Sequence, residues 1–376
     1  MTRSESIYLD VVRLTAAVLV VVTHAVQNEL LPLSWAAYVP DLGREAVIVF
    51  FVLSGYVIAF SAETKYASLD RYFISRASRL YSVALPVLLI AFVVDSSAMY
   101  FNGSTYPHEY QYERFYFYIP FHLLFLGEIW AVAERPFTAD PYWSLSYEAW
   151  YYVWFATLFY FCGWRRVILF LLVALVVGYQ HLILFPIWLS GVALYRNRER
   201  LVLSIVAARI GMILSGAAVV VLEYSGGDIW LWQLGRDTWP FPALPQGSAD
   251  QYFLDYVVCL CACAHLHCAR FAKLDLFLRW ESFIKSCAAY TFTLYLTHTI
   301  VMFTWIYNYH FDRENWQHLA LMCWLIVVAT YTIGYLTERR RDIFQRGCTS
   351  LVMFLERTID QLPGVRVFRS SKAPRT

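Results

Sequence analysis

Residues 8–26 read YLDVVRLTAAVLVVVTHAV, a long apolar run with Arg13 near one end and His24 near the other. The eleven-residue spacing places both side chains on one face of a helix, about 16 Å apart along its axis. Ionisable side chains inside a membrane helix are costly, and they usually face a cavity or a partner. We therefore predict a membrane helix whose polar stripe borders a functional cavity. In the alternative interpretation, Arg13 reaches the membrane interface and His24 is a hydrogen-bonded core histidine.

The composition of the whole chain agrees with a membrane protein. The 376 residues are 59% hydrophobic and only 15% charged, which is too apolar for a soluble domain of this length. We predict an all-α, multi-pass integral membrane protein with one membrane domain over residues 1–341. An amphipathic helix and a basic cytoplasmic tail are expected over residues 342–376. The eight cysteines lie mostly in apolar runs, so no disulfide framework is predicted.

Hydropathy predicts about ten spans, near residues 8–28, 43–61, 80–98, 142–162, 167–180, 182–195, 201–222, 251–268, 287–307 and 316–337. Lys and Arg gather in alternate connections, which places both termini in the cytoplasm by the positive-inside rule. The spans at 167–180 and 182–195 are short and could instead form one broken hairpin. The apolar segment at 117–130 would reverse that charge pattern if it crossed fully, so we predict that it is re-entrant or interfacial.

The second span and the loop after it hold candidate ligand-binding groups. In GREAVIVFFVLSGYVIAF, Ser54 and Gly55 mark a place where a ligand or another backbone can come close; ordinary helix packing is the alternative. Glu45, where this span begins, is a candidate acceptor-site or interface residue. Arg76 and Arg79 are three residues apart and share a helix face, where two guanidinium groups suit a phosphorylated ligand. Positive-inside anchoring is the alternative for this pair.

Later spans carry further candidates. Ser144 and Glu148 are four residues apart, so a hydroxyl and a carboxylate share one face of the fourth span. If Glu148 approaches His24, it would orient the imidazole as the third member of a triad does. In the ninth span, Tyr295 and His298 also share a face, with a helix-to-helix hydrogen bond as the alternative role for His298. The tenth span ends with Glu338 beside three arginines.

These motifs together resemble the acyltransferase 3 family of integral membrane acyltransferases. The resemblance rests on Arg13-x10-His24, Phe-Phe-x-x-Ser-Gly at 50–55, Arg76-x-x-Arg79, Trp-Ser-Leu-Ser-Tyr-Glu at 143–148, YTFTLYLTH at 290–298 and Tyr-x-x-Glu-Arg at 335–339. The motifs occur in family order and cover the chain to about residue 342. One departure is Arg340, which stands where the family often has proline. No fused esterase-like domain is expected in this chain.

The resemblance implies an O-acyltransferase of the bacterial inner membrane. It would move an acyl group, usually acetyl, from acetyl-CoA or another acyl-CoA to a hydroxyl of a carbohydrate or other cell-envelope acceptor. In this interpretation Arg76 and Arg79 hold the coenzyme A phosphates and Arg13 steadies the donor, with Ser54 and Gly55 in the same donor site. His24 is the general base or an acyl relay, with Glu148 and Ser144 beside it. Membrane lipids are expected partners and nucleic acids are not; the oligomeric state is left open.

Parts of the sequence also fit two other interpretations. A transporter or exporter would use intramembrane Arg, His and Glu as a substrate or proton path, but the sequence has no repeated halves and no matched pair of broken helices. The cysteine-rich CLCACAHLHC at 259–268 is the second alternative, as a metal site. Only Cys259 and Cys263 align on one helix face, so we predict a packed apolar span and no metal.

Overall fold

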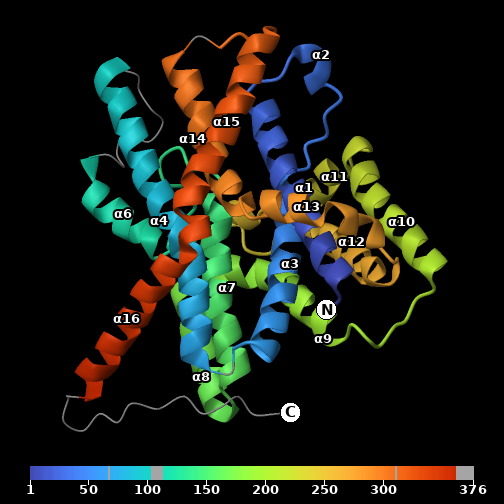
Figure 1. Cartoon of the computed structure of the whole chain (residues 1–376), viewed down its shortest axis with the longest axis vertical. Coiled ribbons are helices and arrows are strands. Elements are labelled where there is room, and N and C mark those ends of the chain that lie inside the picture. Colours follow the sequence, from blue (N-terminus) through green and yellow to red (C-terminus); the bar gives the residue numbers. More distant parts are fainter. Residues whose placement is uncertain (67, 103–112, 310, 361–376) are drawn as a thin grey trace.

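The computed structural model describes residues 1–66, 68–102, 113–309 and 311–360, and over these residues its regular structure is entirely helical (Figure 1). This confirms the all-α class. Within the described ranges, six helices are long and apolar enough to cross a membrane: α1 (Arg3–Gln27), α3 (Gly43–Thr64), α4 (Leu69–Asn102), α10 (Ile205–Tyr224), α12 (Tyr252–Phe271) and α15 (Trp316–Leu336). The chain is therefore an integral membrane protein by the length and composition of its helices.

The other four predicted spans also coincide with helices. They are α7 (Tyr142–Tyr160), α8 (Gly163–Val177), α9 (Tyr179–Arg196) and α14 (Thr291–Asn308). These helices have between 15 and 19 residues, fewer than the roughly 20 that cross a bilayer upright. Ten crossings therefore remain a prediction. Only Gly178 separates α8 from α9, and its φ of +82° makes the turn there one that favours glycine.

The segment at 117–130 does not form a long helix. Its helix α6 covers only Phe115–Leu123, about 13 Å at the usual rise per residue, and irregular chain follows it. This length agrees with the predicted re-entrant or interfacial segment. The remaining short elements are α2 (Leu33–Ala36), α11 (Gly227–Asp237), η1 (Gly247–Ala249), η2 (Asp275–Trp280), α13 (Glu281–Ala288) and η3 (Glu338–Arg340).

A helix, α16 (Arg341–Asp360), covers the first part of the predicted amphipathic segment, and the predicted basic tail lies outside the described residues. It begins directly after η3 and extends away from the other helices (Figure 1). Its first residue ties it to α4: the Arg341 guanidinium donates to the Ser75 carbonyl at 2.8 Å and to the Ser78 hydroxyl at 3.3 Å. These hydrogen bonds hold the start of α16 against α4, the helix that also carries Arg76 and Arg79.

Helix α3 packs closely against α9 because glycines let the two backbones approach each other. A Cβ atom at Gly55 would overlap the carbonyl oxygen of Trp188, and one at Gly191 would overlap the carbonyl oxygen of Val52. Small residues at such crossings let helices gain dispersion contacts in a membrane, where lipid competes equally well for apolar surface. The structure therefore confirms close backbone approach at Gly55, and the approaching group is α9.

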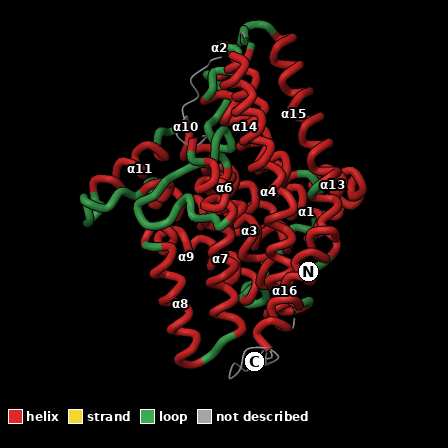
Figure 2. The backbone as a smooth tube through the Cα atoms, turned by 90° about the vertical axis from the view of Figure 1, so that its left-hand side faces the viewer, coloured by secondary structure: helices red, strands yellow, loops and turns green. Residues whose placement is uncertain are grey.

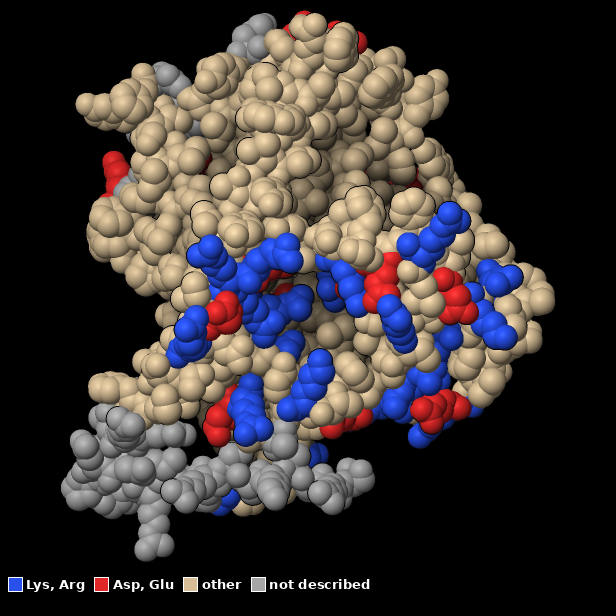
Figure 3. All heavy atoms as spheres, in the orientation of Figure 1, with Lys and Arg blue, Asp and Glu red and all other residues tan. Residues whose placement is uncertain are grey.

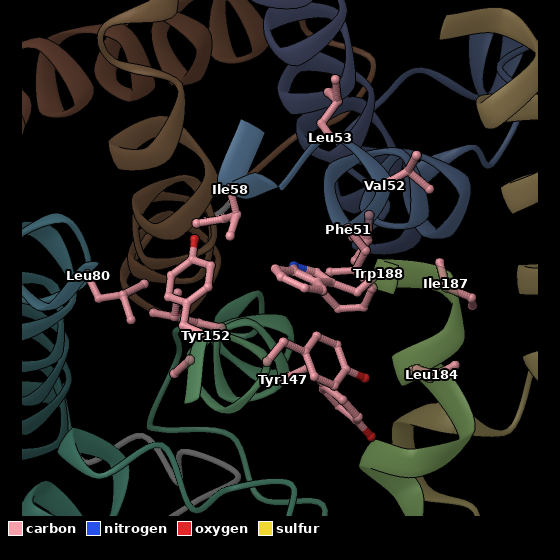
Figure 4. Packing of buried hydrophobic residues seen from close by; sticks show 14 of the residues in the cluster. Phe51, Val52, Leu53, Ile58, Leu80, Tyr147, Tyr152, Leu184, Ile187 and Trp188 are labelled. Carbon is pink, nitrogen blue, oxygen red and sulfur yellow. The ribbon is translucent and has the colours of Figure 1, made fainter. Parts of the chain in front are cut away.

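Aromatic side chains fill the space between α3, α7 and α9. Figure 4 shows Trp188 of α9, Phe51 of α3 and the α7 residues Tyr147 and Tyr152 gathered in one aromatic cluster. The Phe51 and Tyr147 ring centroids are 6.2 Å apart, and those of Tyr152 and Trp188 are 6.5 Å apart. Rings at these separations add edge and offset contacts to the burial of their apolar surface. This packing holds α7 against α3 at the depth where the candidate residues lie.

Charged side chains are unevenly distributed on the surface. Figure 3 shows Lys and Arg gathered in a band across one part of the molecule, while the upper part of the same face carries almost none. In Figures 1 and 2, the beginning of α1 and helix α16 lie toward the end of the molecule opposite α2. This arrangement is the one that the positive-inside rule requires if that end faces the cytoplasm. The orientation itself remains a prediction.

Candidate active site

Two neighbouring cavities contain most of the predicted site residues. The first, the basic pocket, is formed by residues of α1, α3, α4, α7 and α14. Its polar lining is Arg13, Arg76, Arg79, Ser54, Ser144, Glu148, Tyr152, Thr291 and Tyr295. The second, the polar pocket, is lined by His24, Thr23, Gln27, Arg44, Glu134, Arg135, Asp140, Trp143, Ser248, Asp250, Gln251 and Tyr295, among others.

The arginines of the basic pocket have few anionic partners. Arg13 contacts Asp10 on its own helix at 3.2 Å. Arg76 is 7% exposed and donates only to neutral hydroxyl groups, and its Nε is buried without a hydrogen-bond partner. The Arg79 guanidinium makes no ion pair or hydrogen bond with another described side chain. Buried cations are stable only when paired, so this pocket has unfilled capacity for an anion.

Glu148 is held by hydroxyl groups within the basic pocket. Its carboxylate accepts a hydrogen bond from Ser54 at 2.6 Å and one from Tyr152 at 2.5 Å. Trp188 of α9 donates in turn to the Ser54 hydroxyl at 3.2 Å. This network joins α3, α7 and α9 and gives Ser54 a defined role in the pocket wall. Gly55 is not among the lining residues, because it faces the α9 backbone.

The expected contact between Glu148 and His24 is not the one that forms. The two residues line different pockets, and each has other hydrogen-bond partners. Sequence spacing does not determine how α7 is rotated about its axis relative to α1. The triad-like arrangement of Glu148 with His24 is therefore corrected by the structure.

The partner of His24 is His298 of α14. The Nδ1 atom of His24 lies 2.9 Å from the Val20 carbonyl oxygen and 3.1 Å from Nε2 of His298. The Nδ1 atom of His298 lies 2.9 Å from the Leu294 carbonyl oxygen. Among the described residues, Nε2 of His24 has no hydrogen-bond partner, and the side chain borders the polar pocket. That nitrogen is the ring atom available for chemistry.

The two pockets meet at Tyr295. Val47 and Tyr295 line both cavities, and the Tyr295 hydroxyl is hydrogen bonded to Ser144 at 2.6 Å. Ser144 also donates to the carbonyl oxygen of Pro141, so its position at the start of α7 is fixed. The Ser144–Tyr295 pair therefore lies on the boundary between the arginine-lined space and the space beside His24.

Four predicted site residues line neither pocket: Gly55 and His298, described above, and Glu45 and Glu338. Glu45 is buried and lines a separate, mainly apolar cavity of about 1010 Å³ between α1, α3, α10 and α12, with one carboxylate oxygen unpartnered. Glu338 accepts hydrogen bonds from the backbone amide of Thr293 at 3.1 Å and from its hydroxyl at 2.9 Å. It thereby satisfies a free amide in the first turn of α14, which is a structural role for a carboxylate at a helix N-terminus.

Sequence reasoning missed several groups in the polar pocket. Arg44 forms a two-point contact with the buried Asp255 of α12, at 2.8 and 2.5 Å, and its guanidinium lies over the Trp143 ring at 4.9 Å. Asp140 and Arg135 come from the irregular chain before α7. Loop residues carry no periodic pattern, so the only signal in the sequence was Trp143, which adjoins the predicted Ser144.

The cysteine-rich segment contributes to helix packing. The Sγ atoms of Cys259 and Cys263 lie 3.1 and 3.3 Å from the Ser190 hydroxyl of α9. As the spacing predicts, these two residues share the face of α12 that contacts α9. All eight cysteines are free thiols.

Comparison with protein families gives one match. A family model described as an acyltransferase domain matches residues 6–337, nearly the whole chain. Nothing among curated proteins or solved structures matches the chain. The matched range begins before Arg13 and ends just before Glu338, so it includes all the residues that line the two pockets.

Proposed function

Because the chain belongs to the acyltransferase 3 family, we propose that it transfers an acyl group, most simply acetyl, from acyl-coenzyme A in the basic pocket to a hydroxyl of a carbohydrate or other cell-envelope acceptor in the polar pocket. The observation that carries this proposal is that the two cavities lie next to each other. Unpaired guanidinium groups line one, an imidazole with an unoccupied Nε2 borders the other, and Tyr295 adjoins both.

The basic pocket fits the donor by charge. Coenzyme A carries phosphate groups, and guanidinium groups bind phosphate oxygens through paired, charge-assisted hydrogen bonds. The unpartnered Nε of Arg76 and the free guanidinium of Arg79 supply such donors, and Arg13 of α1 adds a third cation. Phe50, Phe51 and other apolar side chains line the same cavity and suit the pantetheine arm. Acyl-CoA would thus be held by its phosphates with its thioester directed toward Tyr295.

The polar pocket fits a neutral, hydroxyl-rich acceptor. Its lining combines carboxylates, guanidinium groups and amides with the Trp143 ring, and Arg44 is already paired with Asp255. Hydroxyl groups can both donate to carboxylates and accept from guanidinium groups, and sugar faces pack on aromatic rings. An anionic ligand would meet three carboxylates there, so a carbohydrate hydroxyl is the better match.

In the proposed reaction His24 is the general base. Its Nε2 takes the proton of the acceptor hydroxyl as the oxygen attacks the thioester carbon. A new C–O ester bond forms, the C–S bond breaks, and the coenzyme A thiolate leaves and takes up the proton from the imidazolium. General-base assistance of this kind contributes typically ~10²–10⁴ in rate. Glu148 acts indirectly, because it fixes Ser54 and Tyr152 in the wall of the donor site.

The charge distribution supports an orientation for this reaction. We place the Lys- and Arg-rich end in the cytoplasm of a bacterial inner membrane, by the positive-inside rule. The arginines of the donor site would then be accessible to cytoplasmic acyl-CoA. His24, about 16 Å further along α1 than Arg13, would be nearer the outer side, where envelope carbohydrates are found.

A direct test is acyl transfer from radiolabelled acetyl-CoA to envelope glycans in membranes that contain the protein. We expect ester-linked label with the wild-type chain and with Cys261→Ala, and none above background with His24→Ala or Arg13→Ala. Equal labelling by the wild-type and His24→Ala chains would overturn the proposal. A transporter, the other class considered, needs no coenzyme A site and would transfer no label.

A further inference from the structure

His298 is a fully buried histidine that the proposed chemistry has not yet used. It lies on α14, is 0% exposed, and contacts His24 across the interface between α1 and α14. The ring centroids are 5.0 Å apart and the ring planes are inclined by 59°, so the contact is a nitrogen-to-nitrogen hydrogen bond and not a stacked pair.

The partners of the two rings determine which nitrogens carry protons. Nδ1 of His298 faces the Leu294 carbonyl oxygen, which can only accept, so that nitrogen must be protonated. A neutral His298 then presents a lone pair at Nε2. Nδ1 of His24 faces this lone pair and also the Val20 carbonyl oxygen. Both neighbours are acceptors, so Nδ1 of His24 carries the hydrogen, and its Nε2 carries the lone pair.

The other arrangements place like groups together. If His24 carried its proton on Nε2, the lone pair at Nδ1 would face an oxygen at 2.9 Å and a nitrogen lone pair at 3.1 Å. If His298 were doubly protonated, a full charge would lie on a side chain with no exposed surface, and no carboxylate in the described part of the chain is hydrogen bonded to it. Burying an unpaired charge costs several kcal/mol, so neither arrangement competes.

We propose that His298 is a positioning residue that holds His24 in the tautomer whose Nε2 is free to take the acceptor proton. This inference rests on the proposed function, and it adds that the general base is held in its proton-accepting tautomer by His298. When Nε2 of His24 receives the proton, the Nδ1–H bond to His298 becomes charge-assisted and stronger. His298 thus stabilises the imidazolium that forms during attack, and it makes no contact with either substrate.

Two substitutions separate this role from simple packing. The side-chain amide of His298→Gln reaches the place of Nε2 and can accept from His24. The shorter amide of His298→Asn reaches only the place of Nδ1, near Leu294. We expect Gln to retain much of the transfer activity. Asn should lower it by at least about tenfold, because a wrong tautomer of the catalytic histidine costs a serine-protease triad about 10⁴ in kcat.

The tautomer itself can be measured by ¹⁵N NMR of histidine-labelled protein in lipid nanodiscs, with His24→Gln used to assign the His24 signals. Wild-type His24 should show a protonated Nδ1 and an unprotonated Nε2. His298→Asn should show a mixture. A protonated Nε2 in the wild type overturns the proposal, as does equal activity of the Gln and Asn variants. If His24→Ala transfers normally, the proposed function fails, whereas the tautomer result still decides the role of His298.

Discussion

The basic pocket and the polar pocket differ in how their charges are satisfied. In the polar pocket the Arg44 guanidinium is paired with Asp255 through two hydrogen bonds. In the basic pocket Arg76 donates only to hydroxyl groups, and Arg79 has no ion pair with a described carboxylate. A protein that leaves buried cations unpaired beside a cavity loses stability unless an anion arrives. This difference supports our proposal that the basic pocket binds an anionic donor and the polar pocket a neutral acceptor.

The largest expected effect comes from removing the proposed base. His24→Ala should lower the rate of acyl transfer by about 10²–10⁴, the usual contribution of a general base. Transfer is measured with saturating acetyl-CoA and acceptor. His265→Ala is a suitable control, because His265 pairs with Tyr8 and Ser215 away from both pockets. Similar losses in both variants would show that the effect of His24→Ala is structural.

The next effect should distinguish the donor site. Arg76→Ala and Arg79→Ala should each raise the KM for acyl-CoA by about 10- to 100-fold, because a hydrogen bond to a charged group contributes about 1.5–3 kcal/mol. The KM for the acceptor should not change. Arg71→Ala, at an exposed position on the first turns of α4, is the matched control for loss of positive charge. A rise with Arg71→Ala of the same size would indicate only general attraction to a basic surface.

A smaller effect, on the KM for the other substrate, is expected at the acceptor site. Trp143→Ala removes the ring that borders the polar pocket, and Asp140→Asn replaces a carboxylate with an amide there. Each should raise the KM for the acceptor by about three- to tenfold, since a neutral hydrogen bond or a ring contact contributes about 1 kcal/mol. The KM for acyl-CoA should stay within error of wild type. If the donor KM changes instead, the assignment of the two pockets is reversed.

The smallest effect tests the boundary between the pockets. Tyr295→Phe deletes the hydroxyl that bonds to Ser144 but keeps the ring. Water should then reach the thioester more easily, and hydrolysis of acyl-CoA without acceptor should rise about two- to fivefold, as expected for a loss near 1 kcal/mol. Released thiol is measured in the absence of acceptor. An unchanged hydrolysis rate would show that this hydrogen bond does not keep water in the polar pocket away from the thioester in the basic pocket.

Much of the fold follows from the sequence because helix periodicity and hydropathy are local properties. All ten predicted spans fall on helices, and Ser144 and Glu148, four residues apart, do line the same cavity. The spacing of Arg76 and Arg79 likewise places both on one pocket wall. These predictions need only the geometry of a single helix.

The pairing between helices could not be predicted in the same way. His24 and His298 are 274 residues apart, and their contact depends on how α1 and α14 are rotated toward one another. Glu148 was expected beside His24, but α7 presents it to Ser54 instead. Glu338 reaches the first turn of α14 because η3 turns the chain there. The sequence of a helix determines which of its residues share a face, but it does not determine which faces of two helices contact each other.

Binding of coenzyme A to the protein in nanodiscs tests the central claim most directly, because it separates the donor site from the base. We predict that the wild-type and His24→Ala proteins bind coenzyme A with equal affinity, and that Arg76→Ala binds it at least about tenfold more weakly. If the wild-type protein binds no coenzyme A, or if His24→Ala loses binding while Arg76→Ala keeps it, the assignment of donor and acceptor to these two pockets is contradicted.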